Sequence, residues 1–418
     1  MTMLRIALRS LKQHALSTTV TVASAALACG LVMAVFAVAT QSTQAFQGGA
    51  LGFDAVLGAR GSSTQLVLNT VYHLETSPGN IPWMMYYEIS LDPRVEEAYP
   101  YVVGDNYRGF RIVGTEPELF DEYLIDDKSP FEFVGHGEIF DPSLRQAIVG
   151  SVVAQETGLK RGDSLNPTHQ LAEHGDHTHD EDYVVVGVLK ATNTPVDRVI
   201  WIPMEGMWRM EGHFLRGAGE DYQAMPDEYI PDEHKEVSAV MLRLKKTSSG
   251  LALQNLYNKK DKRATLAWPV AAEVQRLFQR LGWVNKVLTL VAYLVMFVAA
   301  GSLLASLYNT MNERRREFAI LRSLGARRST LLGIIVIEST LIATLGALFG
   351  FAVYYGILSV AANVIRQETG VVMDRNAMHP ALAWAPIGMV VVGAIAGCIP
   401  AIKAYSTDVA RVLSESAA

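Results

Sequence analysis

The side chains best suited to metal chemistry cluster in residues 169–182. Four of the chain's ten histidines fall in this segment, together with five acidic residues. Imidazole and carboxylate groups are the ligands that Zn²⁺ and similar ions take from proteins. We therefore predict zinc binding, with the histidines as the main ligands and either of two aspartates assisting: His174, His177 and His179 first, then His169, Asp176 and Asp180. Such a loop could sense zinc, hand it over or recognise a metal-bearing partner.

Two other interpretations of this segment stay open. Histidine-rich tracts often form flexible polar hairpins with incidental metal affinity. A membrane-anchored metallohydrolase is disfavoured, because the H-x-x-H-x-H spacing lacks the acid of the H-x-H-x-D-H pattern and no second ligand set is obvious. A loop that contains glycine is also a poor support for rigid catalytic ligands. We expect no catalytic residues and no cofactor used for catalysis.

A second group of charged residues lies in residues 311–328, which we predict to contain a short basic helix. Glu313 and Glu317 lie one turn apart near its start, where acidic groups suit the positive end of the helix dipole. We expect Phe318, Leu321 and Leu324 to form its apolar face. We expect the arginines to point to solvent, lipid headgroups or a partner: Arg314, Arg315, Arg316 and Arg322.

Four apolar stretches, residues 18–40, 284–307, 331–358 and 383–402, are long enough to cross a bilayer, which takes about 20 residues as a helix. Residues 1–17 are expected to form an amphipathic helix. Their basic residues resemble a secretory leader, but the following apolar run is longer than a signal core, so it is kept as a membrane span. Glu338, in the third stretch, is expected to have a structural role near the headgroups.

Basic residues collect on the cytoplasmic side of membrane helices. Residues 1–17, 308–330 and 403–418 together hold eleven basic and four acidic residues, a net charge of +7, whereas the whole chain has a net charge of −6. These segments are therefore predicted to be cytoplasmic. Residues 41–283 and the short loop 359–382 are predicted to be periplasmic.

The inserted segment 41–283 is predicted to be an α+β domain. Residues 111–114 and 183–189 read as strands, 151–159 as a short helix, and 218–236 as an exposed loop. A stalk helix is expected at residues 268–283, where apolar residues recur at alternating spacings of four and three: Val270, Val274, Leu277 and Leu281. This row of apolar residues (the stalk seam) predicts one of two arrangements. The helix either packs on a partner helix and continues unbroken into the membrane, or it is an amphipathic helix that lies on its own domain.

The segment from Asn312 to Ala326 resembles the signature of MacB/FtsX-type (type VII) ABC transporter permeases, N-E-R-x-x-E-[IF]-x-[IL]-L-[RK]-[AS]-[LI]-G-A, which follows their second membrane helix. Further similar segments occur in the same order as in that family: 110–115, 147–154, 158–163, 184–189, 200–203 and 399–404. The resemblance implies four membrane helices, one and then three, around a MacB-like periplasmic domain. No G-x-x-x-x-G-K-[ST] motif occurs in the chain, so it is predicted to be a permease without a fused ATPase domain.

The resemblance implies that the segment 308–330 docks on two copies of a separate ABC ATPase, which binds ATP. The residues implied in this coupling are Glu313 to Phe318, Leu321, Arg322, Leu324 and Gly325. Membrane anchoring by anionic lipids is the alternative for the arginines. The expected function is the transmission of ATP-driven motion to the periplasmic domain of a homodimer in the bacterial inner membrane. Zinc-linked, lipoprotein, peptide or lipid cargo and a periplasmic or outer-membrane partner are expected, but no nucleic acid. The alternative is an FtsX-like regulatory permease that activates a periplasmic hydrolase.

Overall fold

The computed structural model describes residues 2–48, 51–168, 181–210, 213–225, 228–280, 282–323, 325–369 and 378–405. The chain forms two compact units. The helical unit consists of Met1–Gln41, Leu281–Asn363 and Asp374–Ala418, and the sheet domain consists of Ser42–Arg280 and Val364–Met373.

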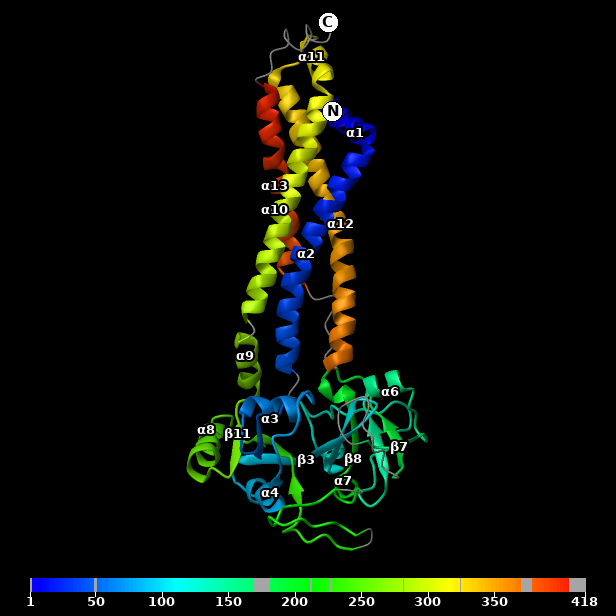
Figure 1. Ribbon diagram of the computed structural model, residues 1–418, viewed down its shortest axis with the longest axis vertical. Helices are drawn as coiled ribbons and strands as arrows, with labels where there is room; N and C mark the ends of the chain where they lie inside the picture. The colour runs from blue at the N-terminus through cyan, green and yellow to red at the C-terminus, as the bar shows by residue number, and fades with distance from the viewer. Residues whose placement is uncertain are drawn as a thin grey trace. The chain divides into compact units, whose positions relative to one another are not determined.

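The helical unit holds six helices among its described residues. They are α1 (Thr2–Gln13), α2 (Ala15–Gly48), α10 (Gly282–Glu313), α11 (Arg315–Ser323), α12 (Arg328–Thr369) and α13 (Ala381–Tyr405). Within the described residues, four helices are long and apolar enough to cross a membrane, namely α2, α10, α12 and α13. The sheet domain is inserted between the first of them and the other three (Figure 1). The predicted fold class, one membrane helix followed by three with an α+β domain between them, is thus confirmed.

Small residues bring the membrane-length helices into close contact. A Cβ atom built on Gly350 of α12 would lie 3.0 Å from Cβ of Cys29 on α2, and one on Gly346 would collide with Ala25. On α13, Gly393 and Gly397 face α12 in the same way, against Ala343 and Ser339 respectively. Both G-x-x-x-G spacings within the membrane-length helices therefore lie at helix–helix contacts, as this motif does in membrane proteins.

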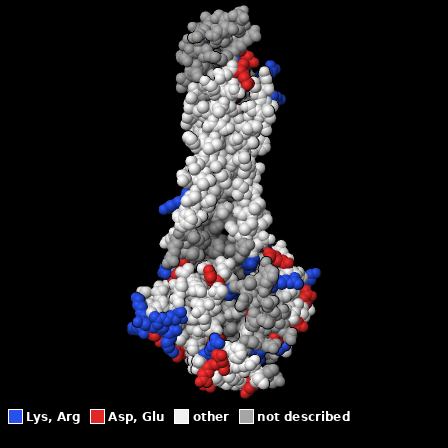
Figure 2. All heavy atoms as spheres, in the orientation of Figure 1, with Lys and Arg blue, Asp and Glu red and all other residues white. Residues whose placement is uncertain are grey.

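The outer surface of the helical unit is apolar. On the face seen in Figure 2, charged side chains are nearly absent over most of the length of the helices, whereas the sheet domain carries both signs of charge. On α10, large apolar side chains are exposed, among them Phe297 and Val298 at 76% and 67%. Exposure on this scale is costly in water and favourable in lipid.

The sheet domain contains a nine-stranded mixed sheet in the order β11-β1-β10-β3-β4-β8-β5-β7-β6. The pairs β4–β8 and β5–β7 are parallel and the others antiparallel. The strands are β1 (Ala55–Ala59), β3 (Val95–Tyr107), β4 (Phe110–Thr115), β5 (Gln146–Val149), β6 (Ser164–Leu165), β7 (Tyr183–Val188), β8 (Val199–Pro203), β10 (Ala239–Leu244) and β11 (Ala264–Ala267). A small second sheet pairs β2 (Ile81–Pro82) with β9 (Glu236–Val237).

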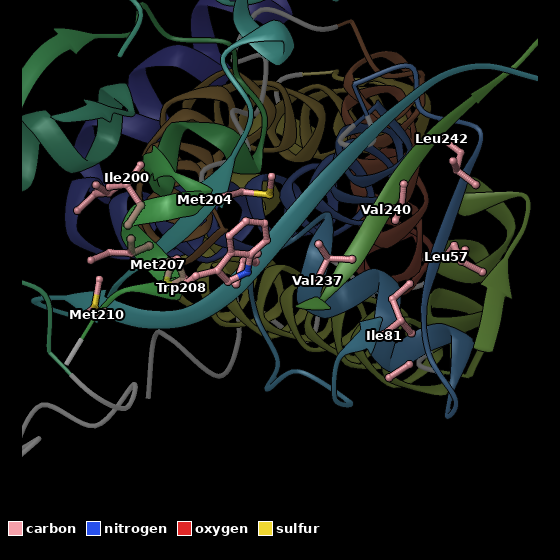
Figure 3. Close-up of a cluster of buried hydrophobic side chains, with 14 of the residues drawn as sticks. Leu57, Ile81, Ile200, Met204, Met207, Trp208, Met210, Val237, Val240 and Leu242 are labelled. Atoms are coloured by element: carbon pink, nitrogen blue, oxygen red, sulfur yellow. The ribbon is translucent and has the colours of Figure 1, made fainter. Parts of the chain in front are cut away.

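Apolar residues on both faces of the sheet are covered by helices, which gives two hydrophobic cores. One core includes side chains from α4 (Trp83–Ser90), α6 (Ser151–Thr157), α7 (Met204–Trp208) and α8 (Ser249–Asn255). Figure 3 shows part of it, with Met204, Met207 and Trp208 beside Ile200 of β8. The other core includes α3 (Ser63–Thr70) and α5 (Glu118–Asp121). The remaining short elements are η1 (Pro195–Arg198) and η2 (Leu256–Asp261).

Most of the local predictions for this domain match its elements. The predicted strands are β4 and β7, and the predicted short helix is α6, which ends at Gly158 with a φ of 79°, a conformation that favours glycine. The segment 218–236 differs from the predicted exposed loop, because Ile230 is fully buried and Tyr222 stacks on His234 with ring centroids 4.2 Å apart.

The predicted stalk corresponds to α9 (Val270–Arg280), while α10 begins separately at Gly282. The first turn of α9 packs on its own domain. Val270 is 1% exposed within the second core, and Glu273, also buried, accepts a hydrogen bond from Thr64 of α3 at 3.2 Å. The side chains of Val274 and Leu277, and the whole of Leu281, lie outside the described residues. The start of the seam thus matches the interpretation of a helix lying on its own domain.

The third membrane-length helix extends beyond the predicted span. α12 has 42 residues and continues through 359–369, which we predicted to be part of a loop. Its last described residues belong to the sheet domain, where Arg366 Nη2 donates a hydrogen bond to Gln155 Oε1 of α6 at 3.1 Å.

Candidate functional site

The coupling segment, defined here as residues 308–330, is a helix–turn unit between α10 and α12. α10 ends at Glu313, α11 covers Arg315–Ser323, and α12 begins at Arg328. Gly325 has a φ of 94°, and the amide of Ala326 donates to the carbonyl of Leu321 at 3.0 Å. A helix often ends at a residue with this left-handed conformation, which glycine adopts most easily, so Gly325 ends α11.

One face of α11 is buried against the helical unit. Phe318 is 8% exposed and packs with Leu331 and Ile335 of α12, and Leu321 lies against the same cluster. The predicted apolar face is therefore present for Phe318 and Leu321, whereas the side chain of Leu324 lies outside the described residues. Burial of this face fixes the orientation of α11 on the helical unit.

Arg314, at the junction of α10 and α11, does not point to solvent as we predicted. Its Nη1 lies 3.2 Å from Glu338 Oε2 on α12, and its Nε lies 3.0 Å from Glu317 Oε2. The side chains of Arg314 and Glu338 are each only 7% exposed. A carboxylate buried between apolar helices needs a cation, and Arg314 supplies it. The expectation of solvent-facing arginines was thus wrong for Arg314, while the structural role expected for Glu338 agrees with this ion pair.

Ser10 of α1 completes this buried network, and the sequence did not point to it. Its hydroxyl donates to Glu338 Oε1 at 2.7 Å and accepts from Arg314 Nη1 at 2.5 Å. The adjoining cavity has a volume of only about 10 Å³, room for one water molecule at most. The network therefore joins α1, the α10–α11 junction and α12.

A neighbouring face of this segment, from Glu313 at the end of α10 to Ile320 of α11, is open. The side chains of Glu313 and Glu317 are 53% and 49% exposed, and Ile320 is 44% exposed. These three residues follow each other at spacings of four and three, so they lie on one side of the segment. Gly325 and Arg327 are also exposed, and Arg322 is partly buried, whereas the side chains of Arg315 and Arg316 lie outside the described residues.

The predicted zinc ligands lie outside the described residues, because His169, His174, His177, His179, Asp176 and Asp180 all fall within 169–180. The loop that holds them connects the antiparallel strands β6 and β7, which pair Ser164 with Val184. On either side of it, Asn166 Nδ2 donates to Asp182 Oδ1 at 2.6 Å. Within the described residues there is no group of three or more side chains able to hold a metal ion.

The sheet domain also contains a cavity of about 320 Å³ beside β3. His213 lines it, with Nε2 3.2 Å from Asp105 Oδ2 and Nδ1 3.0 Å from the carbonyl of Met207. Burial lowers the pKa of His213, but the Asp105 carboxylate outweighs this effect and raises the pKa above its ordinary value. His213 was not predicted as a site residue.

Comparison with known proteins shows a similarity that includes the coupling segment. Residues 289–409 match the family described as FtsX-like permease C-terminal. A comparison with curated proteins found no match. Two solved structures are similar to parts of this chain. The periplasmic region of MacB from Actinobacillus actinomycetemcomitans is 8% identical with a TM-score of 0.32, covering 55% of this chain and 94% of that one.

The second similar structure is the extracellular domain of the noncanonic ABC-type transporter YknZ from Gram-positive bacteria. It is 12% identical with a TM-score of 0.29, covering 51% of this chain and 99% of that one. The family match covers residues 289–409, which include most of α10, all of α11 and α12, and α13. Residues 289–409 are therefore similar to FtsX-like permeases, which confirms the predicted resemblance to MacB/FtsX-type permeases over this part of the chain.

Proposed function

We propose that this chain is the permease subunit of an ABC transporter and transmits the motion of a separate ATPase to its sheet domain. The match of residues 289–409 to FtsX-like permeases supports a transport subunit. The excess of basic residues in 1–17, 308–330 and 403–418 supports a cytoplasmic location for both termini and for the coupling segment. The sheet domain would then be periplasmic, and the protein would be an inner-membrane homodimer with two ATPase subunits.

The observation that carries this proposal is that the coupling segment has a buried face and an exposed face. Phe318 and the Arg314–Glu338 pair are buried. Glu313, Glu317 and Ile320 are exposed. Glu317 also pairs with Arg314, but both acidic side chains are about half exposed and would repel anionic lipids, which disfavours a helix that only anchors the protein to such lipids. A protein partner that offers basic and apolar groups fits this face better.

The proposed motion passes through the buried network. When ATP binding closes the ATPases, a force on α11 reaches α12 through the Arg314–Glu338 pair and α1 through Ser10. α12 packs closely on α2 through small residues, so both helices carry the displacement. The sheet domain would change shape without substrate crossing the bilayer through this chain, because ionisable residues are rare within the four membrane-length helices.

A photocrosslinking amino acid placed in α11 tests the docking face. We expect a variant with the crosslinker at Ile320 to crosslink to the ATPase with which the chain is co-expressed and co-purified, and one at the buried Phe318 not to do so. Cysteine labelling of intact cells provides the independent test of orientation. If Ser323→Cys reacts with a membrane-impermeant reagent from outside the cell, the coupling segment is not cytoplasmic and the proposal is wrong.

The cargo of this transporter is proposed by class. Zinc-linked cargo is favoured if the loop 169–182 binds zinc, and lipoprotein, peptide or lipid cargo otherwise. Any of these would be handled by the sheet domain and a periplasmic or outer-membrane partner.

A further inference from the structure

Arg111 of β4 is a buried cation with two donor atoms that are unused among the described residues. The residue is only 6% exposed, yet its Nε and Nη2 atoms have no hydrogen-bond partner among the described residues. Burial lowers the pKa of Arg111, and the charge of Glu75 raises it by a smaller amount. The side chains of Arg111 and Glu75 nevertheless form no ion pair among the described residues. An arginine stays protonated in proteins, and a buried charge is costly unless it is paired.

The unused atoms form the edge with which arginine binds carboxylates. Elsewhere in this domain, Arg94 uses the same edge: its Nε lies 2.8 Å from Asp92 Oδ1 and its Nη2 lies 2.6 Å from Asp92 Oδ2. Two parallel donors of this kind match the two oxygens of a carboxylate or phosphate group. Arg111 therefore presents a buried binding edge for an oxyanion.

Two residues on the same face of the sheet as Arg111 also carry a polar atom without a hydrogen-bond partner among the described residues. In the parallel pair β4–β8, Arg111 is opposite Val199 and Val113 is opposite Trp201, so Arg111 and Trp201 are near neighbours on one face of the sheet. Trp201 is fully buried, and its indole Nε1 has no hydrogen-bond partner. An indole N–H can only donate, so it adds a donor to those of Arg111.

His73 lies over the same face of the sheet. Its ring meets that of Trp201 edge-on at a centroid distance of 6.1 Å, and its Nδ1 has no hydrogen-bond partner. Burial, and then the charge of Arg111, lower the pKa of His73 to about 3, so the imidazole is neutral at physiological pH. A neutral imidazole can donate from Nδ1 without adding a second buried charge. His73 has a φ of 55°, an unusual conformation for a residue other than glycine.

We propose that Arg111, Trp201 and His73 form an oxyanion-binding site in the sheet domain, which takes the carboxylate or phosphate group of a ligand. Arg111 binds two oxygens through its Nε and Nη2, and the indole N–H and the imidazole donate to the same group. The bound anion neutralises the buried guanidinium. This site is separate from the coupling segment and does not depend on the proposed transport function.

Anion titration of the full-length protein in detergent tests the proposal. Acetate is the carboxylate probe and inorganic phosphate is the phosphate probe, each added at constant ionic strength with chloride as the balancing anion. We expect one or both to raise the thermal unfolding midpoint and change the tryptophan fluorescence in a saturable way. The anion that gives the response at the lower concentration identifies the group, carboxylate or phosphate, that the site prefers.

Substitutions test whether the response to the anion depends on Arg111. Arg111→Met should abolish it, and Arg111→Lys, which keeps the charge but lacks the paired edge, should weaken binding about tenfold or more. Arg94→Met removes an edge that is already paired and should leave the response unchanged, as should Glu75→Gln. Trp201→Phe should weaken binding several-fold.

Three outcomes would overturn the assignment. The first is that neither anion gives a saturable response in the unsubstituted protein. The second is that the response survives in both Arg111→Met and Arg111→Lys. The third is that a response arises only in Glu75→Gln, since Glu75 would then be the occupant of the site.

Discussion

Arg314 Nη1 and Glu338 Oε2 lie 3.2 Å apart, and both side chains are almost completely buried. This ion pair joins the coupling segment to the third membrane-length helix. Ser10 bonds to both partners, so the N-terminal helix is joined to the same point. The guanidinium of Arg314 is thus neutralised within the chain, by Glu338 and by the half-exposed Glu317, while Ile320 stays exposed for a partner.

Removal of one member of this pair should be more damaging than removal of both. Arg314→Met leaves the Glu338 carboxylate buried without its cation, at an expected cost of about 3–5 kcal/mol in the free energy of unfolding. The double variant Arg314→Met with Glu338→Leu should recover most of this loss. Thermal unfolding in detergent measures both, with the exposed Arg327→Met as the control. Strictly additive effects of the two single variants would contradict a direct coupling.

Substitution of Gly350 should separate α2 from α12. A Cβ at this position would already lie 3.0 Å from Cβ of Cys29, so the larger side chain of Gly350→Leu forces the two helices apart. We expect a loss of about 1–3 kcal/mol or more, as for other overpacked contacts. Gly356→Leu is the matched control on the same helix, because a Cβ there meets no atom within 4 Å. Equal midpoints of thermal unfolding for the two variants would argue against this contact.

The His213–Asp105 pair should make stability depend on pH. Its folded-state pKa is raised, so the contribution of protonated His213 is fully present below the unfolded pKa of about 6.5 and is lost as the pH rises through the folded value. The unfolding midpoint of the full chain should therefore fall over this range. His213→Gln should flatten the profile. An unchanged pH profile in that variant would show that groups other than His213 cause the dependence.

Zinc should bind to the loop 169–182. Calorimetry on the full-length protein should give a dissociation constant below the micromolar range, because three imidazoles and a carboxylate form a complete tetrahedral set. Joint substitution of His174, His177 and His179 by alanine should abolish binding, while His136→Ala, which lies in a different loop, should not. Affinity no tighter than micromolar would instead indicate a polar hairpin with incidental metal affinity.

Long apolar runs and short strand motifs made much of the fold predictable. The four membrane-length helices follow from hydropathy alone, and β4, β7 and α6 follow from β-branched residues and a terminal glycine. The order of the nine strands could not be predicted, because it depends on contacts between distant segments, such as β10 inserted between β1 and β3.

The candidate site was predictable in position but not in its inner contacts. The motif around Glu313 and Gly325 located the coupling segment, and the spacing of Phe318 and Leu321 indicated its buried face. The role of Arg314 was missed, because four similar arginines give no sign of which one lies at the helix junction. Ser10 was missed because a single serine in an amphipathic helix carries no signal until Glu338 is brought beside it.

The contact between Gly350 and Cys29 leaves no layer of side chains between α2 and α12 to absorb slippage. Both helices also continue into residues of the sheet domain, α2 beyond Gln41 and α12 through Val364, with Arg366 bonded to Gln155. The sheet domain is thus continuous in sequence with two helices that contact each other closely, as well as with α9. In the proposed transport function, a displacement of α2 and α12 would therefore reach the domain through both helices together.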